Sequence, residues 1–470
     1  MGLYHIYGCL PVWAQHAAVT TYGLYWHWQR FGPGYQRYLQ EYAERDRWTA
    51  EAWRGWQEER LKDLLTLAAE HVPYYRQAWG PEEKNAARAG RLEGLPLLEK
   101  TPVRFEAETL LREDPSPRPR FTFHTAGTTG TPLQLPWTVE ELRRSMAVRE
   151  VRSAGWAGVS FTLPRATFGG RMPVLDPEAK DSFYRFNLVE RQVYLSPYHL
   201  RPDTAASYAQ ALSRHRVQWM TGLAVSYYVL ARFLLEQKLE GPPMKAVITT
   251  SEKLTRNMRA VMEEAYRCRV YEEYGTVESV LLATECEQGR LHVSPDVGVV
   301  EILRPDGTPC EPGEVGEVVT TSLLRTCQPL IRYRLGDLAA WDSEPCPCGR
   351  GMPVIKEVLG RVEDIVIGPD GRRMVRFHLV LGNQPHVREG QIIQEELDRI
   401  CVRIAPAPGY GPADTEDIIQ RVQRQLGPSV NVTVELVDAL PRTKAGKVQM
   451  VISHLHNRGW AEAETTGVEG

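Results

Sequence analysis

His124-Thr125-Ala126-Gly127-Thr128-Thr129-Gly130-Thr131-Pro132 is the most informative segment of this 470-residue sequence. It follows a short predicted strand over residues 120–124. Glycines and small hydroxyl residues let backbone N–H groups close on a phosphate, and threonine hydroxyls donate further hydrogen bonds. A Walker loop ends in Gly-Lys-Ser/Thr, whereas Thr131-Pro132 stands here. The segment therefore predicts a phosphate loop of another type, with an ordinary polar turn as the alternative.

The chain that follows this loop alternates between helical and strand patterns. Predicted strands at 216–222, 245–250 and 269–274 are separated by predicted helices at 203–216, 226–238 and 255–266. This alternation is typical of a parallel sheet with crossover helices. The sequence therefore predicts an α/β core.

The pattern changes towards the C-terminus. Short strands dominate residues 291–341, and a turn at Asp370-Gly371, a helix near 413–426 and a strand at 430–437 follow. We expect an α/β protein with a large N-terminal domain and a smaller, mobile C-terminal α+β domain. The expected boundaries are a helical extension over 1–60, the large domain over 61–362 and the small lid domain over 363–470.

The composition is that of an ordinary globular chain. Apolar residues make up 43% and charged residues 24%, and the net charge of -3 favours neither nucleic acid nor an acidic membrane as a partner. No run of about 18 apolar residues predicts a transmembrane segment. Gln15 and His16 interrupt the one candidate for a signal peptide, so we expect a cytoplasmic protein.

The first 60 residues are rich in aromatic side chains. Six of the twelve tryptophans lie there, namely Trp13, Trp26, Trp28, Trp48, Trp53 and Trp56. Helical packing against the main body is one interpretation. Docking on a partner or on the membrane surface is the other, because Trp and Tyr favour such boundaries.

Four further segments carry polar groups suited to nucleotide chemistry. Tyr274-Gly275-Thr276-Val277-Glu278 follows a predicted strand, so Glu278 would lie at the edge where α/β sheets bind ligands and would suit Mg²⁺. The carboxylate that ends Ile331-Arg332-Tyr333-Arg334-Leu335-Gly336-Asp337 can hold ribose hydroxyls. The other two are Gly360-Arg361-Val362-Glu363-Asp364 and Pro441-Arg442-Thr443-Lys444-Ala445-Gly446-Lys447. Each segment alone is more often a turn or a solvated charge cluster.

Together and in this order, the five segments resemble the adenylate-forming superfamily of acyl-CoA synthetases, peptide-synthetase adenylation domains and luciferases. Within it, the sequence is similar to phenylacetate–CoA ligases and to related proteins of capsule or exopolysaccharide gene clusters, which would place it in polysaccharide biosynthesis. The segments behind this narrower resemblance are Val72-Pro73-Tyr74-Tyr75-Arg76, Pro96-Leu97-Leu98, Ile248-Thr249-Thr250-Ser251-Glu252, Pro329-Leu330-Ile331-Arg332-Tyr333-Arg334 and Cys346-Pro347-Cys348-Gly349-Arg350.

The resemblance implies a role for individual residues. The loop of Thr125, Ala126, Gly127, Thr128, Thr129, Gly130 and Thr131 would hold the ATP phosphates. Ser251, Glu252, Tyr274, Gly275 and Thr276 would line the adenine and the acyl carbonyl. Glu278 would bind Mg²⁺, Asp337 and Arg361 the ribose, and Glu363 would lie at the hinge. Lys447 would enter the site during adenylation, and Trp219, Tyr227 and Tyr228 would line the acyl pocket.

Three positions depart from the usual pattern of that superfamily. Thr131 replaces a lysine, Val277 replaces the usual Thr or Ser before the Glu, and Glu363 replaces Asp or Lys. Loss of the lysine would weaken phosphate binding, although Lys447 can still neutralise charge. Glu363 is still an acidic residue, as Asp is at the usual hinge position.

The implied activity is that of an AMP-forming acid–CoA ligase. A small-molecule carboxylic acid would attack the α-phosphate of ATP, which gives acyl-AMP and releases pyrophosphate. The acyl group would then pass to coenzyme A, and AMP would leave. The chemistry needs positioning and charge stabilisation rather than a protein nucleophile. One alternative is transfer of the acyl group to an amine, giving an amide. The other is a non-catalytic relative that binds nucleotide, for which Thr131 is the best argument.

A metal site is expected from the cysteines. Cys346 and Cys348 form a tight pair, and a tetrahedral site needs four ligands. Cys286 and His292 are the most plausible partners, and relatives of the phenylacetate–CoA ligase type resemble this pattern. The resemblance thus supports a structural Zn²⁺ site, against the alternative of four unrelated reduced residues.

Overall fold

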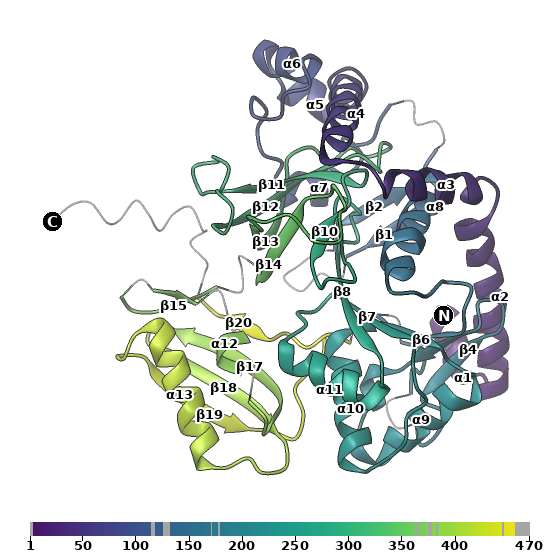
Figure 1. The fold of residues 1–470 in the computed structure, drawn as a ribbon, viewed down its shortest axis with the longest axis vertical. Coiled ribbons are helices and arrows are strands. Elements are labelled where there is room, and N and C mark those ends of the chain that lie inside the picture. Colours follow the sequence, from purple (N-terminus) through teal and green to yellow (C-terminus); the bar gives the residue numbers. More distant parts are fainter. Residues whose placement is uncertain are drawn as a thin grey trace.

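The computed structural model describes residues 3–113, 118–125, 132–170, 172–176, 179–361, 365–370, 372–374, 378–381, 384–443 and 446–455. Its N-terminal part is helical, and Figure 1 shows most of these helices along one edge and the top of the molecule. The helices are α1 (Leu3–Cys9), α2 (Val12–Phe31), α3 (Tyr35–Arg45), α4 (Ala50–His71), α5 (Pro73–Ala78), α6 (Pro81–Arg88) and α7 (Lys100–Phe105). Helix α4 continues across residue 60, so the N-terminal extension and the large region share one helix.

A mixed sheet forms the centre of the molecule. Within the described residues it has twelve strands, in the order β11-β12-β13-β14-β10-β9-β8-β7-β6-β3-β5-β4. The parallel part consists of β5 (Gln192–Leu195), β3 (Arg165–Phe168), β6 (Trp219–Leu223), β7 (Ala246–Thr250) and β8 (Arg269–Gly275). Its crossover helices are α9 (Ala205–Arg214), α10 (Ala224–Glu236) and α11 (Arg256–Tyr266). The predicted α/β core is therefore confirmed.

Antiparallel strands extend this sheet on both sides. On one edge lies β4 (Tyr184–Asn187). On the other side lie β9 (Leu282–Glu285), β10 (Leu291–Val293), β11 (Gly298–Leu303), β12 (Val315–Ser322), β13 (Tyr333–Trp341) and β14 (Val354–Arg361). A separate hairpin, β1 (Phe121–His124) with β2 (Gln134–Trp137), is followed by α8 (Val139–Val148). A π-helical turn, Arg149–Ala154, continues α8.

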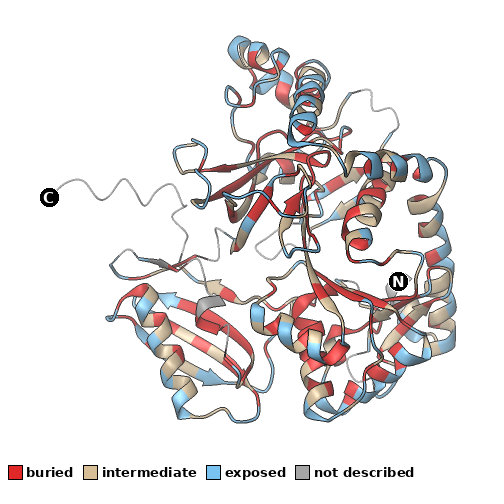
Figure 2. Cartoon of the chain, viewed as in Figure 1, coloured by how far each residue is buried: buried red, intermediate tan, exposed pale blue. Residues whose placement is uncertain are grey.

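The C-terminal part has its own sheet and its own core. The strands β19 (Asn431–Leu436), β18 (Arg399–Pro406), β17 (Val387–Glu396) and β20 (Val451–Ser453) pair in that order, and α13 (Pro412–Leu426) packs on them. A short hairpin, β15 (Val366–Ile367) with β16 (Arg373–Met374), and the short helix α12 (His378–Leu381) precede them. Figure 2 shows buried residues concentrated in the strands of both sheets, with exposed residues on the outer helices.

The predicted helix 413–426 and strand 430–437 thus match α13 and β19 closely. The predicted boundaries of the domains stay a prediction. Among the described residues, no helix combines the length and apolar character needed to cross a membrane.

Candidate functional site

The candidate site lies at the carboxyl ends of the parallel strands. Gly222 near the end of β6 has φ 131°, and an added Cβ would lie 1.9 Å from the carbonyl oxygen of Phe168, so only glycine fits there. Ser251 follows β7 with φ 70°, and Ser279 follows Glu278 with φ 50°. Left-handed backbone at non-glycine residues is uncommon, and it turns the chain sharply out of the sheet at both points. These turns place Glu252 and Glu278 at one edge, where α/β sheets bind ligands.

The hairpin of β1 and β2 presents the glycine- and threonine-rich loop. The Leu133 N–H donates to Thr125 Oγ1 at 3.0 Å, and the Thr125 N–H donates to the Leu133 carbonyl at 3.4 Å. These two bonds close the base of the loop. The six other predicted phosphate-binding residues, 126–131, lie outside the described residues, as does the predicted hinge residue Glu363.

Tyr274 and Asp337 meet across the sheet. The Tyr274 hydroxyl donates to Asp337 Oδ2 at 2.7 Å, and Arg361 Nε lies 3.7 Å from Asp337 Oδ1. Burial, with the Asp337 carboxylate beside it, raises the pKa of Tyr274 well above its usual value, so this phenol stays protonated. The two predicted ribose-binding residues, Asp337 and Arg361, therefore lie together.

Glu278 is held from two sides. The Tyr333 hydroxyl donates to Glu278 Oε1 at 3.4 Å, and Arg325 Nη1 donates to the Glu278 carbonyl oxygen at 3.0 Å. Only 8% of Glu278 is exposed. Two residues away, the buried hydroxyl of Thr276 has no hydrogen-bond partner among the described residues. Because buried polar groups are nearly always paired, this hydroxyl is free to accept or donate a hydrogen bond to a ligand at the sheet edge.

Lys447 of the C-terminal part reaches the same edge. Burial lowers the pKa of Lys447. The Glu252 carboxylate opposes this shift, Arg361 adds to it, and Asp337 and Glu278 oppose it further. Thus three predicted site carboxylates and one arginine act on the ammonium group electrostatically, although their parent segments lie far apart in the sequence.

Glu252 joins the two parts of the chain. Its Oε2 accepts the Val225 N–H in the first turn of α10 at 2.9 Å, and its Oε1 accepts the Val448 N–H at 3.3 Å. Burial raises the pKa of Glu252, while these N–H groups, Arg442 and Lys447 counteract the rise. A carboxylate at a helix N-terminus is favourable, so Glu252 also stabilises α10.

Other contacts seat the C-terminal part on the large one. The Tyr198 hydroxyl donates to the Thr443 carbonyl at 2.7 Å, and Arg232 Nη1 donates to the Pro385 carbonyl at 3.2 Å. Leu440 and Val448 pack in the same apolar cluster as α10 and α11. The sequence analysis missed Tyr198, Arg232 and Tyr333, because their roles depend on contacts between distant segments.

The predicted acyl-pocket residues have different surroundings. Trp219 and Tyr227 are buried, and the Tyr227 hydroxyl already bonds the backbone of Ala166, Phe168 and Thr221. The Tyr228 hydroxyl instead donates to the Val387 carbonyl of the C-terminal part at 3.3 Å. Their contact with an acyl group stays a prediction.

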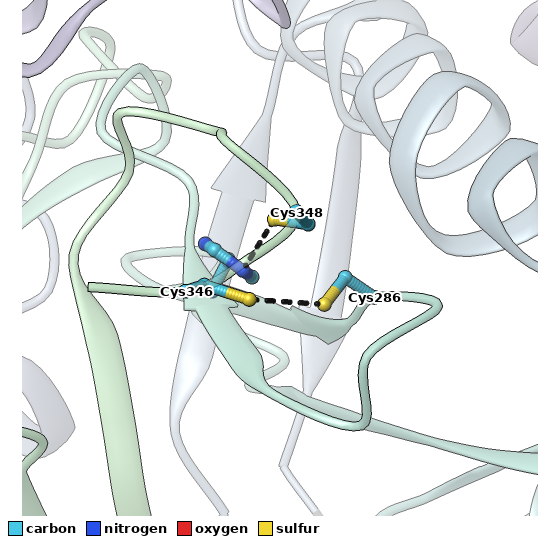
Figure 3. Close-up of side chains that lie close together, drawn as sticks. Cys286, Cys346 and Cys348 are labelled. Atoms are coloured by element: carbon cyan, nitrogen blue, oxygen red, sulfur yellow. Dashed lines mark hydrogen bonds between the residues drawn. The ribbon is translucent and has the colours of Figure 1, made fainter. Parts of the chain in front are cut away.

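The predicted metal ligands converge. One ligand atom from each of Cys286, His292, Cys346 and Cys348 lies within 4.8 Å of the others. The Cys286 and Cys346 sulfurs are 3.6 Å apart, and Cys348 Sγ lies 3.3 Å from His292 Nε2 (Figure 3). Tetrahedral Zn²⁺ with Zn–S bonds of about 2.3 Å would place two sulfurs about 3.8 Å apart.

A second contact orients the histidine in this cluster. His292 Nδ1 lies 3.3 Å from the Met352 carbonyl, which leads us to place the proton on Nδ1 and the lone pair on Nε2, the atom that faces Cys348. Burial lowers the pKa of His292 to about 4, so the ring is neutral near pH 7. The donor set therefore fits Zn²⁺ with four protein ligands.

Comparison with known proteins agrees with this architecture. Residues 369–454 match the family model of the CapK C-terminal domain. Protein CapK of Staphylococcus aureus is 23% identical over 466 residues, which is 96% of this chain and 100% of that protein. Phenylacetate-coenzyme A ligase of Thermus thermophilus is 26% identical over 453 residues, which is 85% of this chain and 96% of that protein. Over most of its length, the chain is therefore similar to CapK and to phenylacetate–CoA ligases.

Solved structures show the same adenylate-forming fold. A crystal structure of 2-hydroxyisobutyryl-CoA ligase in the postadenylation state has a TM-score of 0.66 at 21% identity, covering 87% of this chain and 91% of that one. The same ligase in the thioesterification state has a TM-score of 0.52.

Proposed function

We propose that this protein activates a carboxylic acid as acyl-AMP, releasing pyrophosphate, and then transfers the acyl group to coenzyme A as a thioester. The observation that supports the proposal is the hydrogen bond from the Val448 N–H to Glu252, which brings the neighbouring Lys447 within electrostatic range of Glu252, Asp337 and Glu278. A mobile ammonium group of this kind counters the negative charge that develops when a carboxylate attacks the α-phosphate. The similarity to phenylacetate-coenzyme A ligase supports CoA as the acceptor.

The other residues position the substrates. Asp337, held by Tyr274 and Arg361, accepts the ribose hydroxyls, while the Thr276 hydroxyl meets the nucleotide or the acyl carbonyl. Glu278 would hold Mg²⁺, which prefers oxygen ligands and supplies charge stabilisation on the phosphates. Thr125 would anchor the loop that receives the phosphates.

Lys447 must also leave the site. The second half-reaction needs room for a thiol to attack the acyl carbonyl, and rotation of the C-terminal part would remove Lys447. The contacts of the C-terminal part with the large part are consistent with such a rotation, since they are a few hydrogen bonds and one apolar segment. A lysine suits the task because a single flexible cation can enter and withdraw.

We also propose that Cys286, His292, Cys346 and Cys348 bind a structural Zn²⁺. The site has four protein ligands, and its role would be to fasten the β9–β10 turn to the segment before β14. It has no part in the proposed reaction.

The test is an assay of pyrophosphate release from ATP with aryl, fatty and hydroxy acids, each with and without CoA. Thioester formed only with CoA would support the proposal. Release of pyrophosphate with transfer only to an added amine would contradict the CoA step, and an absence of release with every acid would contradict adenylation itself.

A further inference from the structure

Helix α2 exposes large apolar side chains and buries several polar ones, which is unusual for a surface helix. Surface helices normally bury apolar residues and expose charged ones. In α2 the buried residues are Gln15, Gly23, Trp26 and Gln29, so only one of the four is a large apolar side chain, whereas Trp13, Leu24 and Trp28 are 74%, 58% and 61% exposed. The outward face therefore calls for an apolar environment other than this chain's own core.

The inward face of α2 is fixed by polar contacts. Gln15 Oε1 accepts a hydrogen bond from Arg185 Nε at 2.7 Å, and the Gln29 carbonyl accepts one from Arg143 Nε at 3.0 Å. A Cβ added to Gly23 would lie 2.3 Å from the Asn187 side chain, so the helix is packed closely there. These contacts, together with the burial of Trp26, hold α2 in an orientation that leaves Trp13 and Trp28 exposed.

The exposed side chains follow one stripe. Trp13, Thr21, Leu24 and Trp28 lie at positions i, i+8, i+11 and i+15, which fall on one side of a helix. Tyr25 borders the stripe and is 43% exposed. Leu188, 65% exposed, lies beside α2, because its N–H donates to Thr20 Oγ1 at 3.2 Å.

The N-terminal segment itself carries no charge before the last turn of α2. Residues 1–29 contain no Asp, Glu, Lys or Arg, and α2 acquires its first charge at Arg30. An exposed patch of tryptophan, tyrosine and leucine without charges has the composition of the boundary between lipid headgroups and acyl chains.

The size of the face argues against another protein as its partner. A helix of 20 residues is about 30 Å long and about 10–12 Å wide, so its outward face offers roughly 300–400 Å². A stable protein interface buries about 800 Å² on each partner. A bilayer imposes no such minimum, because it accepts each inserted apolar side chain separately.

We propose that the outward face of α2, formed by Trp13, Leu24, Tyr25 and Trp28 with the adjacent Leu188, docks this protein reversibly on a lipid bilayer. The helix lies in the plane of the interface, with Gln15, Trp26 and Gln29 towards the protein and Trp13 and Trp28 among the headgroups. Because the face is uncharged, docking does not depend on anionic lipid. The proposal is independent of the acid–CoA ligase activity.

The experiment is flotation of the full-length protein with phosphatidylcholine vesicles, and with phosphatidylcholine–phosphatidylglycerol vesicles, at low salt and at about 0.5 M NaCl, where charge is screened. We expect flotation with both vesicle types at both salt concentrations, and loss of flotation in the Trp13→Ala/Trp28→Ala variant. Phe105→Ala is the matched control, since Phe105 is 68% exposed on α7, and it should float as the wild type does. Equal thermal unfolding temperatures would show that the variants are folded.

Several results would overturn the proposal. One is that the wild type stays at the bottom of the gradient. Another is that the double variant floats as well as the wild type does. Flotation only with anionic vesicles and only at low salt would locate the contact on a basic surface instead. A concentration-dependent dimer in light scattering that the double variant abolishes, without flotation, would assign the face to a second copy of this chain.

Discussion

At the scale of single residues, Lys447 carries the proposed chemistry at a cost in stability. Burial lowers the pKa of this group, so the native state binds its proton less tightly than the unfolded state does. The sequence analysis found Lys447 from its Pro-Arg-Thr-Lys-Ala-Gly-Lys context, but the group of carboxylates around it became visible only in the fold. Placing a cation where it is unfavourable is typical of functional sites.

Replacing Lys447 with Ala should reduce pyrophosphate release by about 10²–10³-fold, because one group that stabilises the transition-state charge is lost. ATP binding, measured by calorimetry, should remain nearly unchanged. An active Lys447→Ala enzyme would contradict the assignment.

Replacing Lys447 with Met should leave the protein as stable as the wild type or more stable, since the buried charge is removed. The lowered pKa also predicts how this difference depends on pH. Below the folded-state pKa the wild type bears the full cost of the buried charge, and that cost diminishes as the pH rises towards the ordinary value of 10.5. Thermal unfolding of both proteins from pH 7 to pH 10 would measure the difference in their stability. A difference in favour of Lys447→Met that grows with pH would contradict the interpretation.

The four metal ligands give a separate prediction for purified protein. We expect about one equivalent of zinc by elemental analysis, as a site with four protein ligands requires. Cys348→Ser should lose most of the metal and unfold at a lower temperature, whereas Cys401→Ser, a cysteine in β18 away from the cluster, should keep both. Wild-type protein with far less than one equivalent would rule out the site.

At the scale of helices and strands, local sequence predicted the parallel part of the sheet well. The apolar run of β7 and the helical pattern of α11 can be recognised from sequence alone. The spacing of apolar residues and the content of β-branched side chains are both properties of a short segment. The π-helical turn after α8 and the pairing of β10 with β14 were not predicted. Both depend on packing between segments that are remote in the chain, and no short-range pattern encodes them.

Glu252 gives a prediction at this scale, because it ties α10 to the segment that carries Lys447. Glu252→Gln should slow adenylation by roughly 10- to 100-fold, since hydrogen bonds to a charged group contribute about 1.5–3 kcal/mol each. Thioester formation from chemically prepared acyl-AMP should change little. Glu240→Gln, an exposed carboxylate beyond α10, is the matched control.

Hydrogen exchange of the 446–452 segment provides a readout of this contact without catalysis. The Val448 amide should exchange faster in Glu252→Gln than in the wild type or the control, because its acceptor is weakened. Unchanged exchange together with unchanged adenylation would show that Glu252 does not hold the C-terminal part in place.

At the scale of the whole molecule, the candidate site depends on how the two parts are arranged, because both contribute residues to it. The large part contributes Glu278, Asp337 and Glu252, and the small part contributes Lys447, so the proposed adenylation would need both parts in contact. The sequence predicted two units and their order. It could not predict that Leu440 and Val448 join the core of the large part, since an apolar residue in a sequence does not say which core it enters.

The central claim is that the docked arrangement makes acyl-AMP and that CoA then receives the acyl group. The most direct measurement is pyrophosphate release from ATP across a panel of carboxylic acids, with and without CoA, followed by identification of the product. We expect release with one class of acid, a thioester only when CoA is present, and neither product in Lys447→Ala. Wild-type protein that binds ATP but releases no pyrophosphate with any acid would contradict it.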